Sequence, residues 1–445
     1  MSPIVIPAPP STDFAKPRVR LLLGTDEYIS FERRVALVPQ HLVVLRENLA
    51  AHDLEVDLLV YRGAGERASG DGHGGFPDDA YRAVGAEIVD EDSLANQPAV
   101  DVVHALKEPT EYESLLPGPF LRLGALHLAS KPPGVCAMLG RRNFAGIFDG
   151  GTVGSCAYLL DGGDRTPIVA SMSRFAGRVA ARHVLDALAD HHLGASKVVV
   201  VGGGVAGRAA IETVKPLVSE LVVVEKYEPM HGWLAGQLAA MGIENHDIRV
   251  DLDDDAVDGA IAIIFAHRSG AQAAEKVCNI DQIRMMEKAA AIADIAIDQG
   301  GSILHPEYDE RDDAVAARSK YQRIFAELGY SYYAETNMPR EAPHGASEHH
   351  GEASLAYVAV LLMLSALHGG PAEAVEVVRA RPMAHYTEPA AVAALDPFSA
   401  HVQDLRNGLQ LTLIHDDIEI TDPDVRADEH MLRWVTGCAA GPAEQ

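Results

Sequence analysis

The apolar residues of this chain gather in short runs that alternate with helical stretches. The runs in the first part of the chain are Val19–Gly24, Glu55–Tyr61, Ala86–Asp90 and Asp101–Leu106. Each has the length of a strand, and the Gly- and Asp-rich segment Ala68–Asp79 between them is typical of a surface loop. This alternation predicts an α/β domain built on a mainly parallel sheet.

A second series of the same kind occupies the middle of the chain. A long helix is expected after Ser173, because apolar residues then recur at helical spacing up to Leu188. Buried strands are expected at Lys197–Val201, Leu221–Glu225, Ala260–Ala266 and Ala291–Ile297. From about Ala353 the chain turns helical again. The expected fold is therefore α/β, with two Rossmann-like doubly wound domains separated by a cleft.

Length, charge and cysteine content narrow the class of protein. A chain of 445 residues exceeds the size at which one core keeps growing, so two domains are expected. The 64 acidic and 37 basic side chains give a net charge of −27, which argues against nucleic acid or an anionic membrane as partner. We find no signal-peptide pattern, no apolar stretch of about 18 residues and no CxxC pair. A cytoplasmic protein without membrane span, disulfide scaffold or structural zinc is expected.

A glycine-rich turn follows the strand at Lys197–Val201. Its residues Gly202-Gly203-Gly204-Val205-Ala206-Gly207 fit the pattern GxGxxG. Gly202 permits the tight turn, Gly204 lets the backbone approach a pyrophosphate, and Gly207 lets the following helix pack on the strand. The N–H groups at the start of that helix, including those of Val205 and Ala206, would then face the phosphates.

Glu225 lies about twenty residues beyond these glycines, at the end of the next strand. A carboxylate there accepts hydrogen bonds from the adenosine ribose and repels a 2′-phosphate, which favours NAD over NADP. The neighbouring Lys226 weakens that preference. The competing interpretation is a glycine-rich turn that binds no nucleotide. With NAD as cofactor, residues 168–343 form the dinucleotide-binding domain, while residues 1–167 and a returning segment, 344–445, build the substrate domain.

Several short stretches together resemble the family of alanine dehydrogenases and nicotinamide nucleotide transhydrogenases. They are Glu32–Pro39 (ERRVALVP), Leu106–Pro109 (LKEP), Leu126–Ser130 (LHLAS), Met172–Arg178 (MSRFAGR), Gly202–Gly207, Asp294–Gly301 (DIAIDQGG) and Asn337–Pro339 (NMP). The resemblance covers most of the chain. It is closest to alanine dehydrogenase, because the transhydrogenase branch usually lacks the Lys and His elements.

The resemblance implies a role for each matching residue. Arg34 and Lys107 would bind the substrate carboxylate and carbonyl group, and His127 and Asp298 would form an acid/base pair with Lys107 assisting catalysis. The cofactor and substrate contacts would also include Met172, Ser173 and Asn337. These residue types suit the chemistry, since a guanidinium matches a carboxylate and a histidine titrates near neutrality. Taken singly, each has a structural interpretation: a surface charge, a core histidine or a turn aspartate.

The chain departs from the family pattern beside the expected substrate. Ala125 stands where alanine dehydrogenases usually have an aromatic residue, and Val169 where leucine is common. Both changes remove bulk, so we expect a substrate-binding pocket at Ala125 that takes a side chain larger than that of alanine. The stretch His344–Glu352 contains metal-ligand residue types, but it precedes an apolar helix, where acidic residues are good capping chemistry. We therefore expect no metal.

The expected function is NAD-dependent oxidative deamination of a small L-amino acid, or the reverse reductive amination of a 2-oxo acid. One alternative is a reductive condensation in which an amino acid amine replaces ammonia, as in saccharopine-type dehydrogenases. Another is a non-catalytic NAD-binding subunit, although such a protein would need no acid/base pair. The resemblance also implies a homo-oligomer.

Overall fold

The structure is a computed structural model, and its elements fall into two units. It describes residues 16–25, 32–70, 72–107, 111–124, 144–149, 168–189, 196–215, 218–267, 274–309, 312, 314–380, 402, 405 and 409–411. Contacts within the chain define unit 1 as Met1–Ser171 with Ala342–Gln445, and unit 2 as Met172–Glu341.

Unit 1 contains a seven-stranded sheet with the order β15-β6-β5-β4-β1-β2-β3. Its strands are β1 (Arg18–Leu23), β2 (Glu55–Tyr61), β3 (Glu87–Val89), β4 (Val102–His104), β5 (Phe120–Gly124), β6 (Phe144–Asp149) and β15 (Leu409–Leu411). All pairs are parallel except β15 with β6. The first six strands therefore have the doubly wound order 3-2-1-4-5-6, and the order reverses between β1 and β4.

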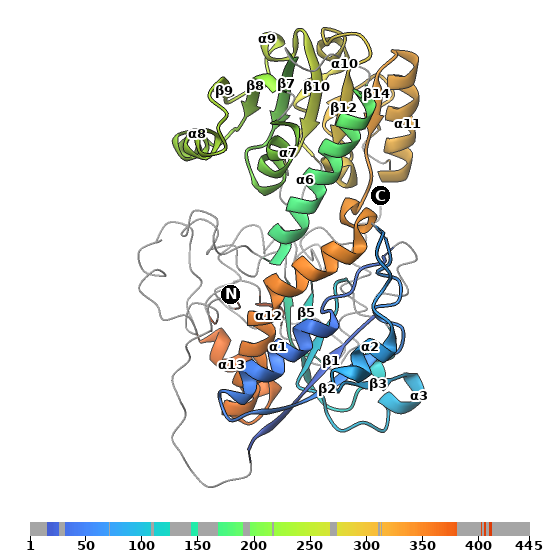
Figure 1. The fold of residues 1–445 in the computed structure, drawn as a ribbon, viewed down its shortest axis with the longest axis vertical. Coiled ribbons are helices and arrows are strands. Elements are labelled where there is room, and N and C mark those ends of the chain that lie inside the picture. Colours follow the sequence, from blue (N-terminus) through green and yellow to red (C-terminus); the bar gives the residue numbers. More distant parts are fainter. Residues whose placement is uncertain are drawn as a thin grey trace, which may run out of the picture. The chain divides into compact units, whose positions relative to one another are not determined.

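Alternate residues of these strands enter two different cores. Leu21 and Leu23 pack in the larger core, whereas Leu22 packs in the smaller one with Tyr112. This period of two is the signature of a strand that is buried on both faces. The helices of unit 1 are α1 (Pro39–Ala50), α2 (Asp78–Ala83), α3 (Glu91–Leu94), η1 (Glu111–Leu115), α12 (Pro343–His368) and α13 (Pro371–Arg379). Helix α12 contacts α1, α13, β1 and β4. Figure 1 shows α12 beside α1 and α13.

Unit 2 contains a six-stranded parallel sheet with the order β14-β12-β10-β7-β8-β9. The strands are β7 (Ser196–Val201), β8 (Val218–Val224), β9 (His246–Arg249), β10 (Ala260–Phe265), β12 (Ala291–Asp294) and β14 (Ser331–Tyr333), and β11 (Cys278–Asn279) pairs separately with β13 (Ile303–Leu304). The six strands again follow the order 3-2-1-4-5-6, with the reversal between β7 and β10. The prediction of two Rossmann-like doubly wound domains is thereby confirmed.

Helices cover both faces of the sheet in unit 2. Val198 and Val200 of β7 pack in one core, and Val199 and Val201 pack in the other. The helical elements are α6 (Ile168–Ala187), α7 (Val205–Val214), η5 (Glu228–Met230), α8 (His231–Ala240), α9 (Asp254–Val257), α10 (Ile280–Ile283), η6 (Ile295–Gln299), α11 (Ala314–Glu327) and η7 (Met338–Glu341). Residues of α6, α7 and α8 build the first core, and residues of α9, α10 and α11 build the second.

Several predicted element bounds are wrong, including the following three. The helix expected after Ser173 already begins at Ile168. The strand expected to reach Ile297 ends at Asp294, because the Asp294 carboxylate accepts the Ala296 N–H and caps a 3-10 turn. The helix expected from Ala353 begins at Pro343, which occupies its first turn.

Helix α12 thus includes the whole His344–Glu352 stretch, and the three histidines of this stretch lie in different environments. His344 stacks on Phe76, His349 is exposed beside Glu352, and His350 is fully buried. By length and composition α12 could cross a membrane, but 72% of its most apolar window is buried inside the structure. A helix that is apolar around most of its circumference is typical of a domain core.

A cluster of buried histidines lies where α12 meets α1 and β4. His104 contacts the Leu123 carbonyl at 3.1 Å and the Ser354 hydroxyl at 3.0 Å, and its ring stacks on His350 with centroids 5.7 Å apart. Among the described residues, neither ring nitrogen of His350 has a hydrogen-bond partner. Burial lowers the pKa of His41 to about 4 and of His104 to about 3, and lowers the pKa of His350 well below its usual range. All three are neutral in the folded protein.

These three histidines predict that the protein loses stability in mild acid. The unfolded chain takes up protons below about pH 6.5, while the folded chain binds none at these rings until about pH 4 or lower. Each ring therefore removes up to about 1.4 kcal/mol of unfolding free energy per pH unit in that window. We expect the urea midpoint to fall steeply from pH 6.5 to 5, and His350→Leu to make that fall shallower. A midpoint independent of pH between 7.5 and 5 would contradict this account.

Candidate functional site

The glycine turn of unit 2 lies where the strand order of its sheet reverses. Gly202 follows β7 with φ +102°, and its N–H donates to the Val224 carbonyl at 2.7 Å. A Cβ on Gly202 would lie 2.9 Å from the backbone of Ala266, which follows β10. Only glycine combines this left-handed conformation with so close an approach of two strand ends.

The next glycines hold helix α7 against the turn. A Cβ on Gly207 would lie 1.8 Å from the Gly202 carbonyl oxygen, so no side chain fits there. At Gly204, in contrast, a Cβ would meet nothing within 4 Å. Gly204 is the N-cap of α7 and supplies no side-chain cap to the helix, in which Val205 and Ala206 are the first residues. The helix start is thus open on the side where a pyrophosphate would approach.

Glu225 is fixed beside this turn by two backbone N–H groups. One carboxylate oxygen accepts the Gly203 N–H at 2.9 Å, and the other accepts the Tyr227 N–H at 3.0 Å. The carboxylate is partly exposed. It therefore stands next to the phosphate-binding turn with its position set, as a ribose ligand requires.

Asp298 lies in η6, directly after β12, and its side chain is exposed. The fully buried Asp294 holds both ends of the loop that carries it. The Asp294 carboxylate accepts N–H groups of Ala296 at 3.0 Å and Ser302 at 2.7 Å, and the Ser302 hydroxyl at 2.9 Å. Sequence reasoning missed Asp294, although it stands four residues before Asp298 in the same motif.

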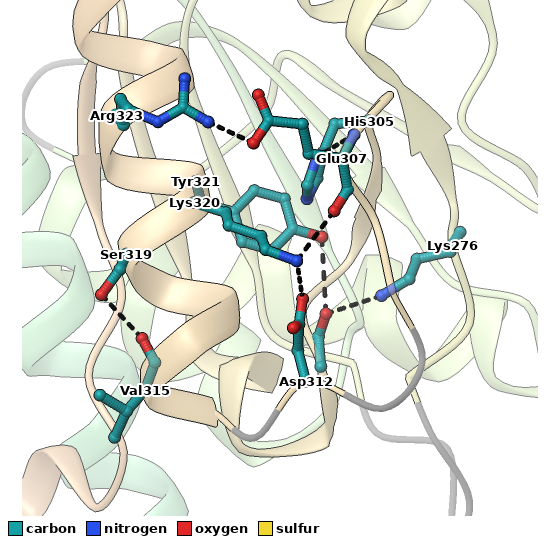
Figure 2. A network of polar contacts seen from close by, with 10 residues as sticks. Lys276, His305, Glu307, Asp312, Val315, Ser319, Lys320, Tyr321 and Arg323 are labelled. Carbon is teal, nitrogen blue, oxygen red and sulfur yellow. Dashed lines mark hydrogen bonds and ion pairs between the residues drawn. The ribbon is translucent and has the colours of Figure 1, made fainter.

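Lys276 and Tyr321 hold the other side of this loop (Figure 2). The Lys276 ammonium donates to the Gly300 carbonyl at 2.7 Å and to the Gly301 carbonyl, and it lies 4.3 Å from the centre of the Tyr308 ring. A Cβ on Gly301 would lie 2.7 Å from the Tyr321 ring. The loop that carries Asp298 is therefore held at Gly300 and Gly301 by the Lys276 charge and by packing against Tyr321, in addition to its hold by Asp294.

Arg34 of unit 1 is buried and paired with Glu32. Its Nε donates to Glu32 Oε1 at 2.8 Å, and its Nη2 donates to Glu32 Oε2 at 2.6 Å. The Arg34 and Glu32 side chains are 2% and 0% exposed. Burial raises the pKa of Glu32, but the charges of Arg34 and Lys107 and the Arg34 hydrogen bonds outweigh it and hold the pKa well below its usual range. Sequence reasoning missed Glu32, whose signal is its place two residues before Arg34.

Lys107 follows β4, and a buried arginine holds its backbone. Arg122 donates to the Lys107 carbonyl at 2.8 Å and to the Ala105 carbonyl at 3.1 Å, while Glu113 accepts its Nε. Because Arg34 follows β1 and Lys107 follows β4, both stand where the strand order of unit 1 reverses. In an open α/β sheet this is the usual place for a ligand.

Of the remaining predicted site residues, the structure describes Met172, Ser173 and Asn337. Met172 is buried and Ser173 is half-buried, both in the first turns of α6. Asn337 has φ +59°, a left-handed conformation that asparagine tolerates better than most residues. His127 and Ala125 lie outside the described residues, so their predicted roles stay predictions. Within the part of the chain that is described, no group of three or more His, Cys, Asp or Glu side chains has an arrangement that could hold a metal ion.

Comparison with known proteins finds the same family along both units. The model described as "Alanine dehydrogenase/PNT, N-terminal domain" matches residues 25–153, and its C-terminal counterpart matches residues 191–370. An alanine dehydrogenase of Staphylococcus epidermidis is 27% identical over 306 residues, which are 64% of this chain and 76% of the relative. Alanine dehydrogenase 2 of Staphylococcus aureus is 28% identical over 317 residues, with 65% and 77% covered.

Solved structures share the fold. An L-alanine dehydrogenase matches with a TM-score of 0.63 and 21% identity, covering 93% of this chain and 99% of that one. A transhydrogenase from Sinorhizobium meliloti matches with a TM-score of 0.57 and 16% identity, covering 82% and 97%.

The contacts of Lys276 predict that its loss loosens the Asp298 loop. Lys276→Met keeps the apolar stem but leaves two carbonyls without their charged donor, which costs about 1–3 kcal/mol. We expect faster amide hydrogen exchange across residues 295–302 and a lower unfolding midpoint. Lys288→Met, on an exposed lysine of the same unit, is the matched control and should change neither. Unchanged exchange in Lys276→Met would contradict the assigned role.

Proposed function

This chain belongs to the alanine dehydrogenase/PNT family, and from that premise we propose that it is an NAD-dependent amino acid dehydrogenase. It would catalyse the oxidative deamination of a small L-amino acid and the reverse reductive amination of a 2-oxo acid. The observation that supports the proposal most is that predicted site residues follow the strands at which the order of each sheet reverses. Arg34 and Lys107 follow β1 and β4, and the glycine turn follows β7.

The residues of unit 2 fit a dinucleotide. The open approach at Gly204 and the first N–H groups of α7 would bind the pyrophosphate, and the fixed Glu225 carboxylate would accept the ribose hydroxyls. When bound, the nicotinamide would supply or accept the hydride. Ser173 and Asn337 would contact the same cofactor. The negative charge of Glu225 favours NAD over NADP.

The residues of unit 1 fit an α-amino or 2-oxo carboxylate. Glu32 neutralises one of the two cations, so the trio Glu32, Arg34 and Lys107 carries a net charge of −1 + 1 + 1 = +1, which a substrate carboxylate would balance. Glu32 also fixes the plane of the guanidinium, and a fixed guanidinium orients a carboxylate better than a mobile one. Lys107 would polarise the 2-oxo group.

His127 and Asp298 would carry out the proton transfers of the reaction. In the deamination direction a water molecule adds to the imine carbon, and a base must take its proton before ammonia leaves. Asp298, exposed on a loop that is held on both sides, would hold the substrate nitrogen and activate that water. His127 would exchange the proton at the carbinolamine oxygen. Met172 and Ala125 would border the substrate side chain, and the small Ala125 supports a side chain larger than that of alanine.

Turnover tests the proposed reaction directly. Purified protein with NADH, ammonium and a panel of 2-oxo acids should consume NADH, fastest with a 2-oxo acid larger than pyruvate. Consumption only when an amino acid replaces ammonium would favour the reductive condensation instead. NADH binding without turnover on any member of the panel would favour a non-catalytic nucleotide-binding protein.

Arg34→Lys tests the carboxylate contact. A lysine keeps the charge but loses the two-point geometry, and one charged hydrogen bond contributes about 1.5–3 kcal/mol, or roughly 10- to 150-fold in affinity. We expect the KM for the 2-oxo acid to rise by about that factor, with an unchanged Kd for NADH. Arg33→Lys, on the exposed neighbour, should leave both constants unchanged. An Arg34→Lys variant with wild-type KM would refute the assignment.

A further inference from the structure

Lys226, the residue after Glu225, forms an ion pair with a second acidic residue, Glu275. Its Nζ donates to both carboxylate oxygens of Glu275, each at 2.9 Å. The two side chains are 72% and 55% exposed. An ion pair so exposed contributes little to the stability of the fold. Its main effect is on the position and the charge of the Lys226 ammonium group.

The backbone around Glu275 is fixed, which lets an exposed pair persist. The Ala274 N–H donates to the Gln299 carbonyl at 2.8 Å, and the Val277 N–H donates to the Ser302 carbonyl at 3.0 Å. Lys276 between them is anchored on Gly300, as described above. The backbone segment that carries Glu275 is therefore anchored before and after this residue. Forming the ion pair with Lys226 then costs less conformational entropy than it would from a mobile loop.

Lys226 stands where a cation decides which coenzyme is accepted. In this fold a carboxylate at the end of the second strand binds the ribose of NAD, whereas a nearby cation accommodates the 2′-phosphate of NADP. This chain has both, side by side. Hydrogen bonding and charge from Glu275, joined by the charge of Asp251, raise the pKa of Lys226, so it remains a cation directed at Glu275. Glu225, Lys226 and Glu275 together carry −1 + 1 − 1 = −1.

We propose that Glu275 is a coenzyme-specificity residue, which holds Lys226 away from the 2′-position and thereby keeps NADP out. The inference rests on the proposed nucleotide site and adds a residue from a distant part of the sequence to it. Glu275 is not itself a predicted ligand of the nucleotide. It acts through the lysine, and through the negative charge that it adds beside Glu225.

Glu275→Gln tests the inference, because it keeps the size of the side chain and removes its charge. Dissociation constants for NADH and NADPH are measured by titrating the nucleotide fluorescence against wild type and variants. We expect the Kd for NADPH to fall about tenfold in Glu275→Gln, and the Kd for NADH to stay within about twofold. The gain should shrink at high salt, since the charges involved are exposed. Glu287→Gln, an exposed acid elsewhere in unit 2, should leave both constants unchanged.

The double variant Glu275→Gln/Lys226→Met separates the lysine from a general charge effect. If Lys226 carries the gain, the Kd for NADPH returns to the wild-type value. A gain that survives in the double variant would refute the role given to Lys226, and an unchanged NADPH affinity in Glu275→Gln would refute the inference as a whole. Absence of NADH binding by the wild type would refute the nucleotide site itself, and with it this inference.

Discussion

The close approach of α7 to the end of β7 is the constraint on which unit 2 depends. At Gly207 the two backbones leave no space for a Cβ, and at Gly177 helix α6 approaches Ala206 just as closely, with 2.0 Å between an added Cβ and the carbonyl oxygen. The close packing of α7 on the end of β7, and of α6 on the start of α7, holds the start of α7 at the strand reversal. The turn, the acid after β8 and the loop after β12 then share the carboxyl edge of one sheet, and the proposed nucleotide site follows from that geometry.

Unit 1 has the same strand order, but there buried ion pairs hold the residues that lie at the reversal. There a buried glutamate holds Arg34, and a second buried ion pair, Arg122 with Glu113, holds the backbone of Lys107. Buried ion pairs of this kind give little net stability, yet removing one partner is costly, so they specify a conformation more than they stabilise it. The two units thus share one topology, and in the proposed function they would use it differently: unit 2 would present backbone N–H groups to phosphates, and unit 1 would present cations to a carboxylate.

Local sequence patterns predict most of the strands and helices, but they do not predict which side chains pair in the folded protein. The strand Lys197–Val201 and the glycines after it are recognisable because burial on both faces and the absence of a Cβ leave direct marks in the sequence. The start of α12 was misplaced since only one face of its first turns is buried, so the continuous apolar pattern that marks the helix begins only near Ala353. The partners Glu32 for Arg34, Lys276 for Gly300 and Glu275 for Lys226 depend on the folded arrangement, and nothing in the sequence around either member marks the last two pairs.

The measurement that bears most directly on the central claim is the fate of the nitrogen. Purified protein is incubated with NADH, a 2-oxo acid and nitrogen-15-labelled ammonium, and the products are identified by mass spectrometry. An amino acid dehydrogenase must produce the labelled α-amino acid in an amount equal to the NADH consumed. A 2-hydroxy acid, or NADH consumption without incorporated label, would contradict the account.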